Sequence, residues 1–96
     1  MRNEICDKLI RRENLVDGDY SYTYELTSRA GDAVAAYGLP LYSVRICMTD
    51  RDGKSREANA KDIFSNHEKA ETFFNKLVRN LATPIDLVYI LEDEIG

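Results

Sequence analysis

The sequence predicts an α+β fold: an antiparallel sheet of three or four strands, with two C-terminal helices packed on one face and a short N-terminal helix. Alternating apolar and polar residues, typical of half-buried strands, occur within residues 19–61. Apolar residues at helical spacing occur within residues 65–82 and 84–95. Because the strands precede these helices instead of alternating with them, a parallel doubly wound sheet is disfavoured. The length of 96 residues indicates a single domain, residues 1–96.

The first element is predicted to be a helix within residues 1–16, packed at one end of the sheet. Its apolar residues recur at spacings of one, three and four: Ile5, Cys6, Leu9 and Ile10. Charged residues occupy most of the other positions. The stretch 14–19 contains Gly18 and is predicted to end this helix.

The first strand is predicted over residues 20–27. One face carries three tyrosines and a leucine, and the other carries polar residues: Tyr20, Tyr22, Tyr24 and Leu26 against Ser21, Thr23, Glu25 and Thr27. A strand with one buried face gives this pattern, so we expect the tyrosines to point into the core. A hairpin turn is predicted at residues 28–32.

Residues 33–50 are predicted to form one long bent strand or two short ones, because Gly38 and Pro40 interrupt the first half. The second half again alternates, with Tyr42, Val44, Ile46 and Met48 against Ser43, Arg45, Cys47 and Thr49. A turn at 50–53 and a polar edge strand over 54–61 follow. We expect the sheet face opposite the helices to meet water or a partner: Ser21, Thr23, Glu25, Ser43 and Arg45.

The helix at 65–82 is predicted to begin at Ser65, with Glu68 completing a capping box. Its apolar stripe is centred on Phe74 and consists of Ala70, Phe73, Phe74, Leu77, Val78 and Leu81. The last helix is predicted to begin with Thr83 as cap and Pro84 in the first turn. Its buried face is predicted to be Leu87, Val88, Leu91 and Ile95. An edge strand over 85–95 is the alternative, since Leu-Val-Tyr-Ile-Leu is strand-like and acids oppose a helix C-terminus.

Three short motifs carry a resemblance to a known family. They are Tyr37-Gly38-Leu39, the Asp62-Ile63 step before the helix cap, and the ending from Thr83-Pro84-Ile85 to Glu92-Asp93-Glu94-Ile95. From Tyr37 onward the chain resembles a small uncharacterised family of proteins from Gram-positive, clostridia-like bacteria. That family is known as a domain of unknown function. The resemblance therefore implies a helical ending and supplies no catalytic residues.

The charge balance excludes some classes of partner. The net charge is −4 and the sequence pI is about 4.9, so neither nucleic acid nor an anionic membrane is expected as a partner. Four of the acids lie in residues 85–96, which contain no lysine or arginine. The opening residues show no signal-peptide core, and a cytoplasmic location is expected.

Sequence motifs for catalysis are weak. His67 and Glu71 have the i, i+4 spacing of a zinc helix, but the second histidine is absent, so no metal and no cofactor is expected. Cys47 with His67 forms the alternative reading, a small enzyme with a thiol nucleophile and a base. We favour a non-catalytic protein–protein interaction or regulatory module whose partner the sequence does not name. Its candidate surface is Tyr89, Ile90, Glu92, Asp93 and Glu94, and unassigned apolar residues lead us to expect a homodimer.

Overall fold

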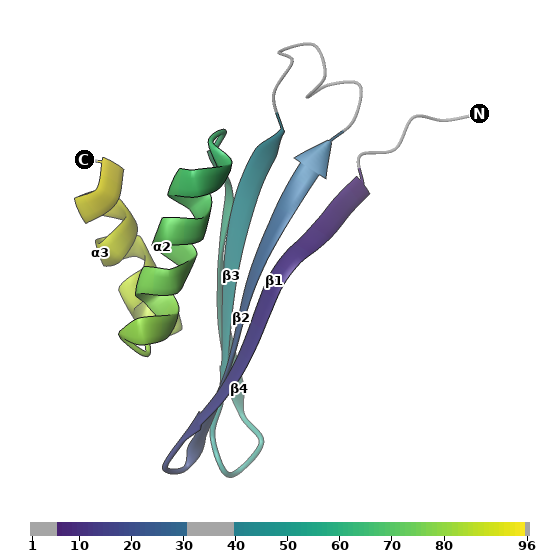
Figure 1. The fold of residues 1–96 in the computed structure, drawn as a ribbon. Helices are drawn as coiled ribbons and strands as arrows, with labels where there is room; N and C mark the ends of the chain where they lie inside the picture. The colour runs from purple at the N-terminus through teal and green to yellow at the C-terminus, as the bar shows by residue number, and fades with distance from the viewer. Residues whose placement is uncertain (1–5, 31–39, 96) are drawn as a thin grey trace.

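The computed structural model describes residues 6–30 and 40–95, and these form a four-stranded antiparallel sheet with two helices on one face (Figure 1). The strands lie side by side in chain order: β1 (Cys6–Asp17), β2 (Tyr20–Ala30), β3 (Leu41–Thr49) and β4 (Ser55–Phe64). Helices α2 (His67–Arg79) and α3 (Pro84–Ile95) follow. The predicted α+β fold is confirmed, and the last segment is a helix and not an edge strand.

The predicted N-terminal helix is wrong, because most of that segment is strand β1. This strand pairs with β2 through a two-residue turn in which Gly18 has a φ of 62°, a conformation that glycine adopts without steric cost. The register shifts between Leu9 and Arg11, so Ile10 is the extra residue of a β-bulge. The bulge lets Ile10 pack against the core beside its exposed neighbour Leu9, and this apolar pair resembled a helical stripe. Ile5 lies outside the described residues.

The turns are partly as predicted. Strand β2 continues through residues 28–30, where a turn was expected, and residues 31–39, with Gly38 and the Tyr37-Gly38-Leu39 motif, lie outside the described part of the chain. The turn at 50–53 is confirmed: the Gly53 N–H donates to the Asp50 carbonyl at 3.0 Å. Strand β4 lies at the edge of the sheet, as predicted. It begins at Ser55 and extends to Phe64, beyond the predicted end at residue 61.

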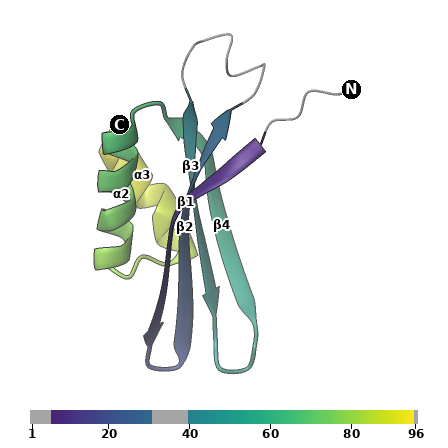
Figure 2. The same cartoon turned by 45° about the vertical axis from the view of Figure 1, so that its right-hand side comes forward.

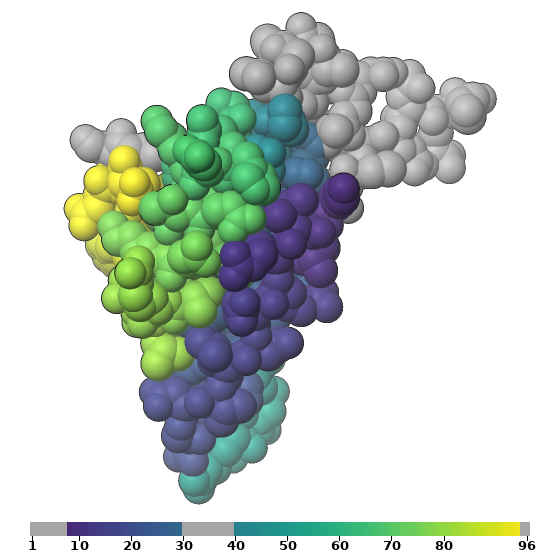
Figure 3. Space-filling view, in the orientation of Figure 1, coloured from purple at the N-terminus to yellow at the C-terminus, as the bar shows by residue number. Residues whose placement is uncertain are grey.

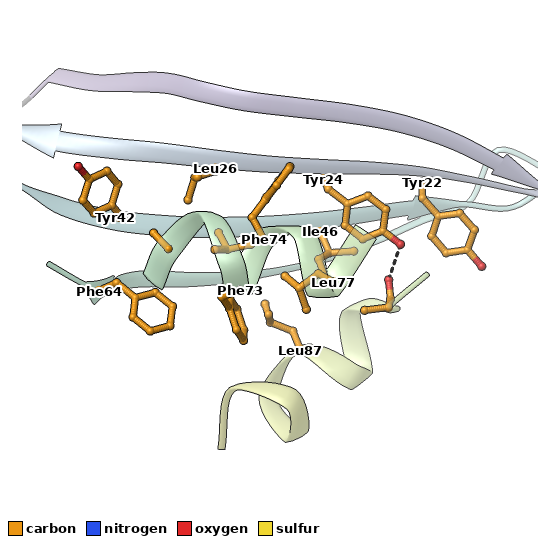
Figure 4. Close-up of a cluster of buried hydrophobic side chains, with 13 residues drawn as sticks. Tyr22, Tyr24, Leu26, Tyr42, Ile46, Phe64, Phe73, Phe74, Leu77 and Leu87 are labelled. Carbon is orange, nitrogen blue, oxygen red and sulfur yellow. Dashed lines mark hydrogen bonds between the residues drawn. The ribbon is translucent and has the colours of Figure 1, made fainter. Parts of the chain in front are cut away.

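The core lies between the sheet and the two helices (Figure 4). Phe74 is fully buried, as predicted, and the guanidinium of Arg11 lies 5.2 Å from the centre of its ring. Tyr24 is also fully buried, and its hydroxyl donates to the Ala82 carbonyl at 2.8 Å, the dashed line in Figure 4. The strand tyrosines therefore point into the core as expected, except Tyr20 near the turn, which is exposed.

Each helix has identifiable end signals. The N-cap of α2 is Asn66 and not the predicted Ser65: the Asn66 Oδ1 accepts the Lys69 N–H at 2.9 Å. At the other end of α2, Leu81 has a φ of 50° and the Ala82 N–H donates to the Leu77 carbonyl, as in a Schellman motif. The predicted cap of α3 is confirmed by reciprocal bonds between Thr83 and Asp86, of 3.0 and 3.3 Å.

The helices cover only part of the sheet. In two views, the ends of the β1–β2 and β3–β4 hairpins extend beyond the helix layer, on the side where α2 ends and α3 begins (Figures 1 and 2). The space-filling view shows the same end as a narrow projection made of these hairpins (Figure 3). One stretch of the helix-facing side of the sheet therefore has no helix above it.

Candidate functional site

The outward face of α3 carries an apolar stripe that is more than half exposed in the described structure. Ile85, Val88 and Tyr89 are 64%, 56% and 65% exposed. Their i, i+3, i+4 spacing places them on one side of the helix, and Glu92 continues the same side. We call these four residues the α3 stripe. Single exposed apolar residues are ordinary, but three adjacent large ones on one helix make this side of α3 a candidate contact surface.

The structure divides the predicted interaction surface. Tyr89, Glu92, Asp93 and Glu94 are exposed, whereas Ile90 is partly buried against the core. Val88, predicted to be buried, is exposed instead. The reason is helical geometry: Leu87, Ile90 and Leu91 recur at spacings of three and four and share the inner side of α3. Ile85 and Val88 are the surface residues that sequence reasoning missed, and the same spacing rule identifies them.

The charge of α3 is one-sided. Asp86 lies in its first turn, acids occupy its last turn, and that turn has no basic residue. Among the described residues, only Glu94 of these acids reaches a cation, with a carboxylate oxygen 3.5 Å from the Lys76 Nζ. Glu92 and Asp93 form no ion pair with any described residue. The end of the α3 stripe is therefore flanked by uncompensated negative charge.

A second surface lies on the projecting hairpins, on the same side of the sheet as the helices. Antiparallel register places Leu15 beside Tyr22, Tyr22 beside Met48, and Met48 beside Arg56 on this side. A depression of about 500 Å³ lies here, lined by Tyr20, Met48, Asp50, Lys54, Ser55 and Arg56. We define the hairpin ledge as Leu15, Tyr20, Met48, Lys54 and Arg56. It combines the half-buried Leu15 and Met48 with the exposed Tyr20 and two exposed bases, and one acid, Asp17, lies opposite Tyr20 on the same side.

The opposite side of the sheet carries a chain of ion pairs that crosses all four strands. Arg12 on β1 approaches the Glu25 Oε2 on β2 at 2.7 Å, and the Glu25 Oε1 lies 3.0 Å from the Arg45 Nη1 on β3. Arg45 in turn donates to Glu57 on β4 at 2.6 Å. Register explains this, since Glu25 lies opposite both arginines. The predicted polar face is confirmed, although Ser43 within it is buried.

These contacts determine the ionisation of the central groups. Burial alone would raise the pKa of Glu25, but hydrogen bonds from Arg12 and Arg45 outweigh it and lower the pKa. The hydrogen bond from Arg45 likewise lowers the pKa of Glu57, and the two glutamates together raise the pKa of Arg45. Two arginines and two glutamates thus neutralise one another. We conclude that this chain of ion pairs joins the strands and leaves little charge for an ionic ligand.

A shallow basin adjoins this chain, with a volume of about 380 Å³. Its lining residues are Glu25, Thr27, Arg29, Ser43, Arg45, Asn59 and Lys61. At its rim β4 bulges, and Asp62 has a φ of 55°. The Asp62 N–H donates to the Ser43 Oγ at 2.8 Å, and its carboxylate accepts from Arg29 at 2.9 Å. Arg29 is therefore paired with Asp62, as Arg45 is with two glutamates, and Lys61 is the lining cation that forms no ion pair with a described residue.

The structure does not bring Cys47 and His67 together. Cys47 is a free thiol on the side of the sheet opposite the helices, in register with Thr23 and Glu57. His67 lies on the helix side, where its ring meets Tyr42 edge-on at 5.5 Å and its Nε2 lies 3.3 Å from Glu71. Among the side chains that the structure describes, no group of three histidines, cysteines or acids is placed to hold a metal ion. Neither candidate for catalysis is assembled.

A comparison with known families decides the family of the chain. Residues 2–96 match a family of unknown function, DUF6514. The chain belongs to this family. The match extends well beyond the segment after Tyr37 that carried the resemblance. No curated protein and no solved structure matches the chain.

Within the described part of this DUF6514 domain, neither α2 nor α3 combines the length and apolar character needed to cross a membrane.

Proposed function

We propose that this DUF6514 domain is a non-catalytic protein–protein interaction or regulatory module, and that the α3 stripe is its contact surface. The observation that carries the proposal is the exposure of three large apolar side chains on one side of a helix whose other side is packed on the core. Amphipathic helices that bind in a partner's groove present anchors at this i, i+3, i+4 spacing.

The flanking charges support a selective contact. Glu92 and Asp93 lie at the end of the stripe without partners among the described residues, so a bound surface with basic residues at that point would gain favourable electrostatics. Like charges would oppose an acidic surface in the same position. The proposal therefore includes a partner surface that is apolar at its centre and basic at one edge.

A cytoplasmic location is part of the proposal. Cys47 is a free thiol, which suits a reducing compartment. The sequence pI of about 4.9 also gives the protein the same sign of charge as nucleic acid and anionic lipid, which favours a protein partner over both.

A photo-cross-linking amino acid at position 88 tests the proposal in native cell extract. We expect adducts from position 88 and none from position 59, because Asn59 is exposed on the opposite side of the sheet. Mass spectrometry of the adduct then identifies whatever covers the stripe. Equal labelling from both positions, or no adduct from either, would refute the proposed contact surface.

A further inference from the structure

We propose that the occupant of the α3 stripe is a second copy of this chain, and that each copy places its α3 stripe on the hairpin ledge of the other around a two-fold axis. This inference rests on the proposed function of the α3 stripe and names its partner.

The first argument is shape. The helix layer ends before the sheet does, so the helix-facing side of each molecule has a raised part and a bare part (Figures 1 and 2). Two such surfaces related by a two-fold axis fit together, since the raised part of each copy fills the bare part of the other. A contact of this kind is isologous, the commonest arrangement in soluble homo-oligomers.

The second argument is size. Helix α3 has 12 residues and is therefore about 18 Å long and about 10 Å wide. The two hairpins together contain four strands, which span about 14–19 Å across, close to the length of the helix. The ledge can therefore hold one helix. Because the two-fold axis doubles every contact, each copy buries both a stripe and a ledge, which helps the pair approach the roughly 800 Å² per partner of a stable interface.

The third argument is chemical complementarity. The stripe offers Ile85, Val88 and Tyr89, and the ledge offers Leu15, Tyr20 and Met48, of which Tyr20 is 44% exposed. The acids beside the stripe match Lys54 and Arg56 on the ledge, neither of which forms an ion pair with a described residue. The acid of the depression, Asp50, is already engaged, because its Oδ1 accepts two turn N–H groups at 2.9 Å.

Charge also argues against the simplest alternative, in which two α3 helices pair with each other. Residues 85–96 contain four acids and no lysine or arginine. An antiparallel helix pair would bring Asp86 of one copy toward Glu92 and Asp93 of the other, with no cation between them. Like charges brought close together without a cation between them are destabilising. The ledge, in contrast, offers apolar contact and positive charge together.

Sedimentation equilibrium of the full chain, with a charge exchange, tests the inference. We expect the wild-type protein to reach twice its 11.0 kDa mass at micromolar concentration. Glu92→Lys and Arg56→Glu should each weaken the dimer by about tenfold or more, and the double variant should recover most of the loss, because both copies then carry the exchanged pair. Asn59→Lys, on the opposite side of the sheet, is the matched control and should change nothing. Circular dichroism verifies that each variant is folded.

The outcomes separate this inference from the proposed function. A mass of 11.0 kDa at every concentration, together with cross-links from position 88 to another protein, would overturn the second-copy inference and leave the proposed function standing. A dimer that neither single charge change weakens, or that the double change does not restore, would also overturn the stripe-on-ledge contact.

Discussion

Replacing Tyr24 with phenylalanine tests how the sheet is joined to the connection between the two helices. The Tyr24 hydroxyl donates to the Ala82 carbonyl at 2.8 Å, and both residues are essentially inaccessible to water. The variant leaves that carbonyl buried without this donor, which typically costs about 1–3 kcal/mol. We therefore expect Tyr24→Phe to lower the free energy of unfolding by that amount near neutral pH.

The same tyrosine predicts a dependence on alkaline pH. Burial, with smaller contributions from Tyr22 and Asp86, raises the pKa of Tyr24 from 10.0 to about 12. A tyrosine in the unfolded chain ionises near pH 10, while the folded protein keeps this proton up to about pH 12. The stabilisation that the protonated Tyr24 contributes is therefore complete below pH 10 and is lost as the pH rises to about 12. Each pKa unit corresponds to about 1.36 kcal/mol. The free energy of unfolding of the wild-type protein should therefore fall by roughly 1.4 kcal/mol by about pH 11 and by roughly 2.7 kcal/mol above pH 12.

The assay is chemical denaturation followed by circular dichroism, at about pH 8 and at about pH 11. We expect the stability gap between wild type and Tyr24→Phe to narrow by roughly 1.4 kcal/mol over this range, because only the wild type has the buried hydroxyl. A gap that stays constant with pH, or that is absent near neutrality, would show that the Tyr24 hydroxyl is not buried against Ala82.

Four further predictions follow from the described contacts. Phe74→Ala should cost about 3–5 kcal/mol and His67→Ala less than about 1 kcal/mol in denaturant melts, because the first side chain is fully buried and the second is half exposed; equal losses would mean that α2 presents a different face to the core. Asn66→Ala should cost about 1 kcal/mol and Ser65→Ala far less, and the reverse order in thermal melts would restore Ser65 as the cap. The pKa of Glu25 is lowered in the folded protein, so its ion pairs stabilise the fold fully above the usual pKa of 4.5, and this stabilisation is lost as the pH falls through the pKa of the folded state. The difference in free energy of unfolding between wild type and Glu25→Gln should therefore shrink in acid, and a difference that grows would contradict the ion pairs. A strong chelator should leave the thermal midpoint unchanged, and a large drop, or stoichiometric zinc in a metal assay, would reveal a metal site.

Strand β2 and helix α2 were predictable because each has a strong period. The alternation of Tyr22, Tyr24 and Leu26 identified a half-buried strand, and the stripe through Phe74 identified a helix on that strand's buried side. Strand β1 was missed for a physical reason. Its bulge at Ile10 shifts the alternation by one residue, so the pattern before and after Leu9 does not keep one period. The turn at Gly18 was the available signal for a hairpin.

The candidate surface was only partly predictable. The acids of α3 and Tyr89 were found from sequence because charge and helical position depend on local spacing alone. Val88 and Ile90 were exchanged between the buried and exposed sides, since the rotation of an apolar helix about its axis depends on what it packs against. The hairpin ledge could not be foreseen. It exists because the strands extend beyond the helices, and this difference in reach is a property of the assembled layers.

Hydroxyl-radical footprinting over a range of protein concentrations tests most directly whether the α3 stripe lies on the hairpin ledge. Tyr89 reports the stripe, and Tyr20 and Met48 report the ledge. Leu9, on the side of the sheet opposite the helices and as exposed as Tyr20 at 44%, serves as the internal reference. We predict that Tyr89, Tyr20 and Met48 become protected together as the concentration rises, while Leu9 stays reactive. Protection of Tyr89 without Tyr20 and Met48, or no protection at all, would contradict the contact.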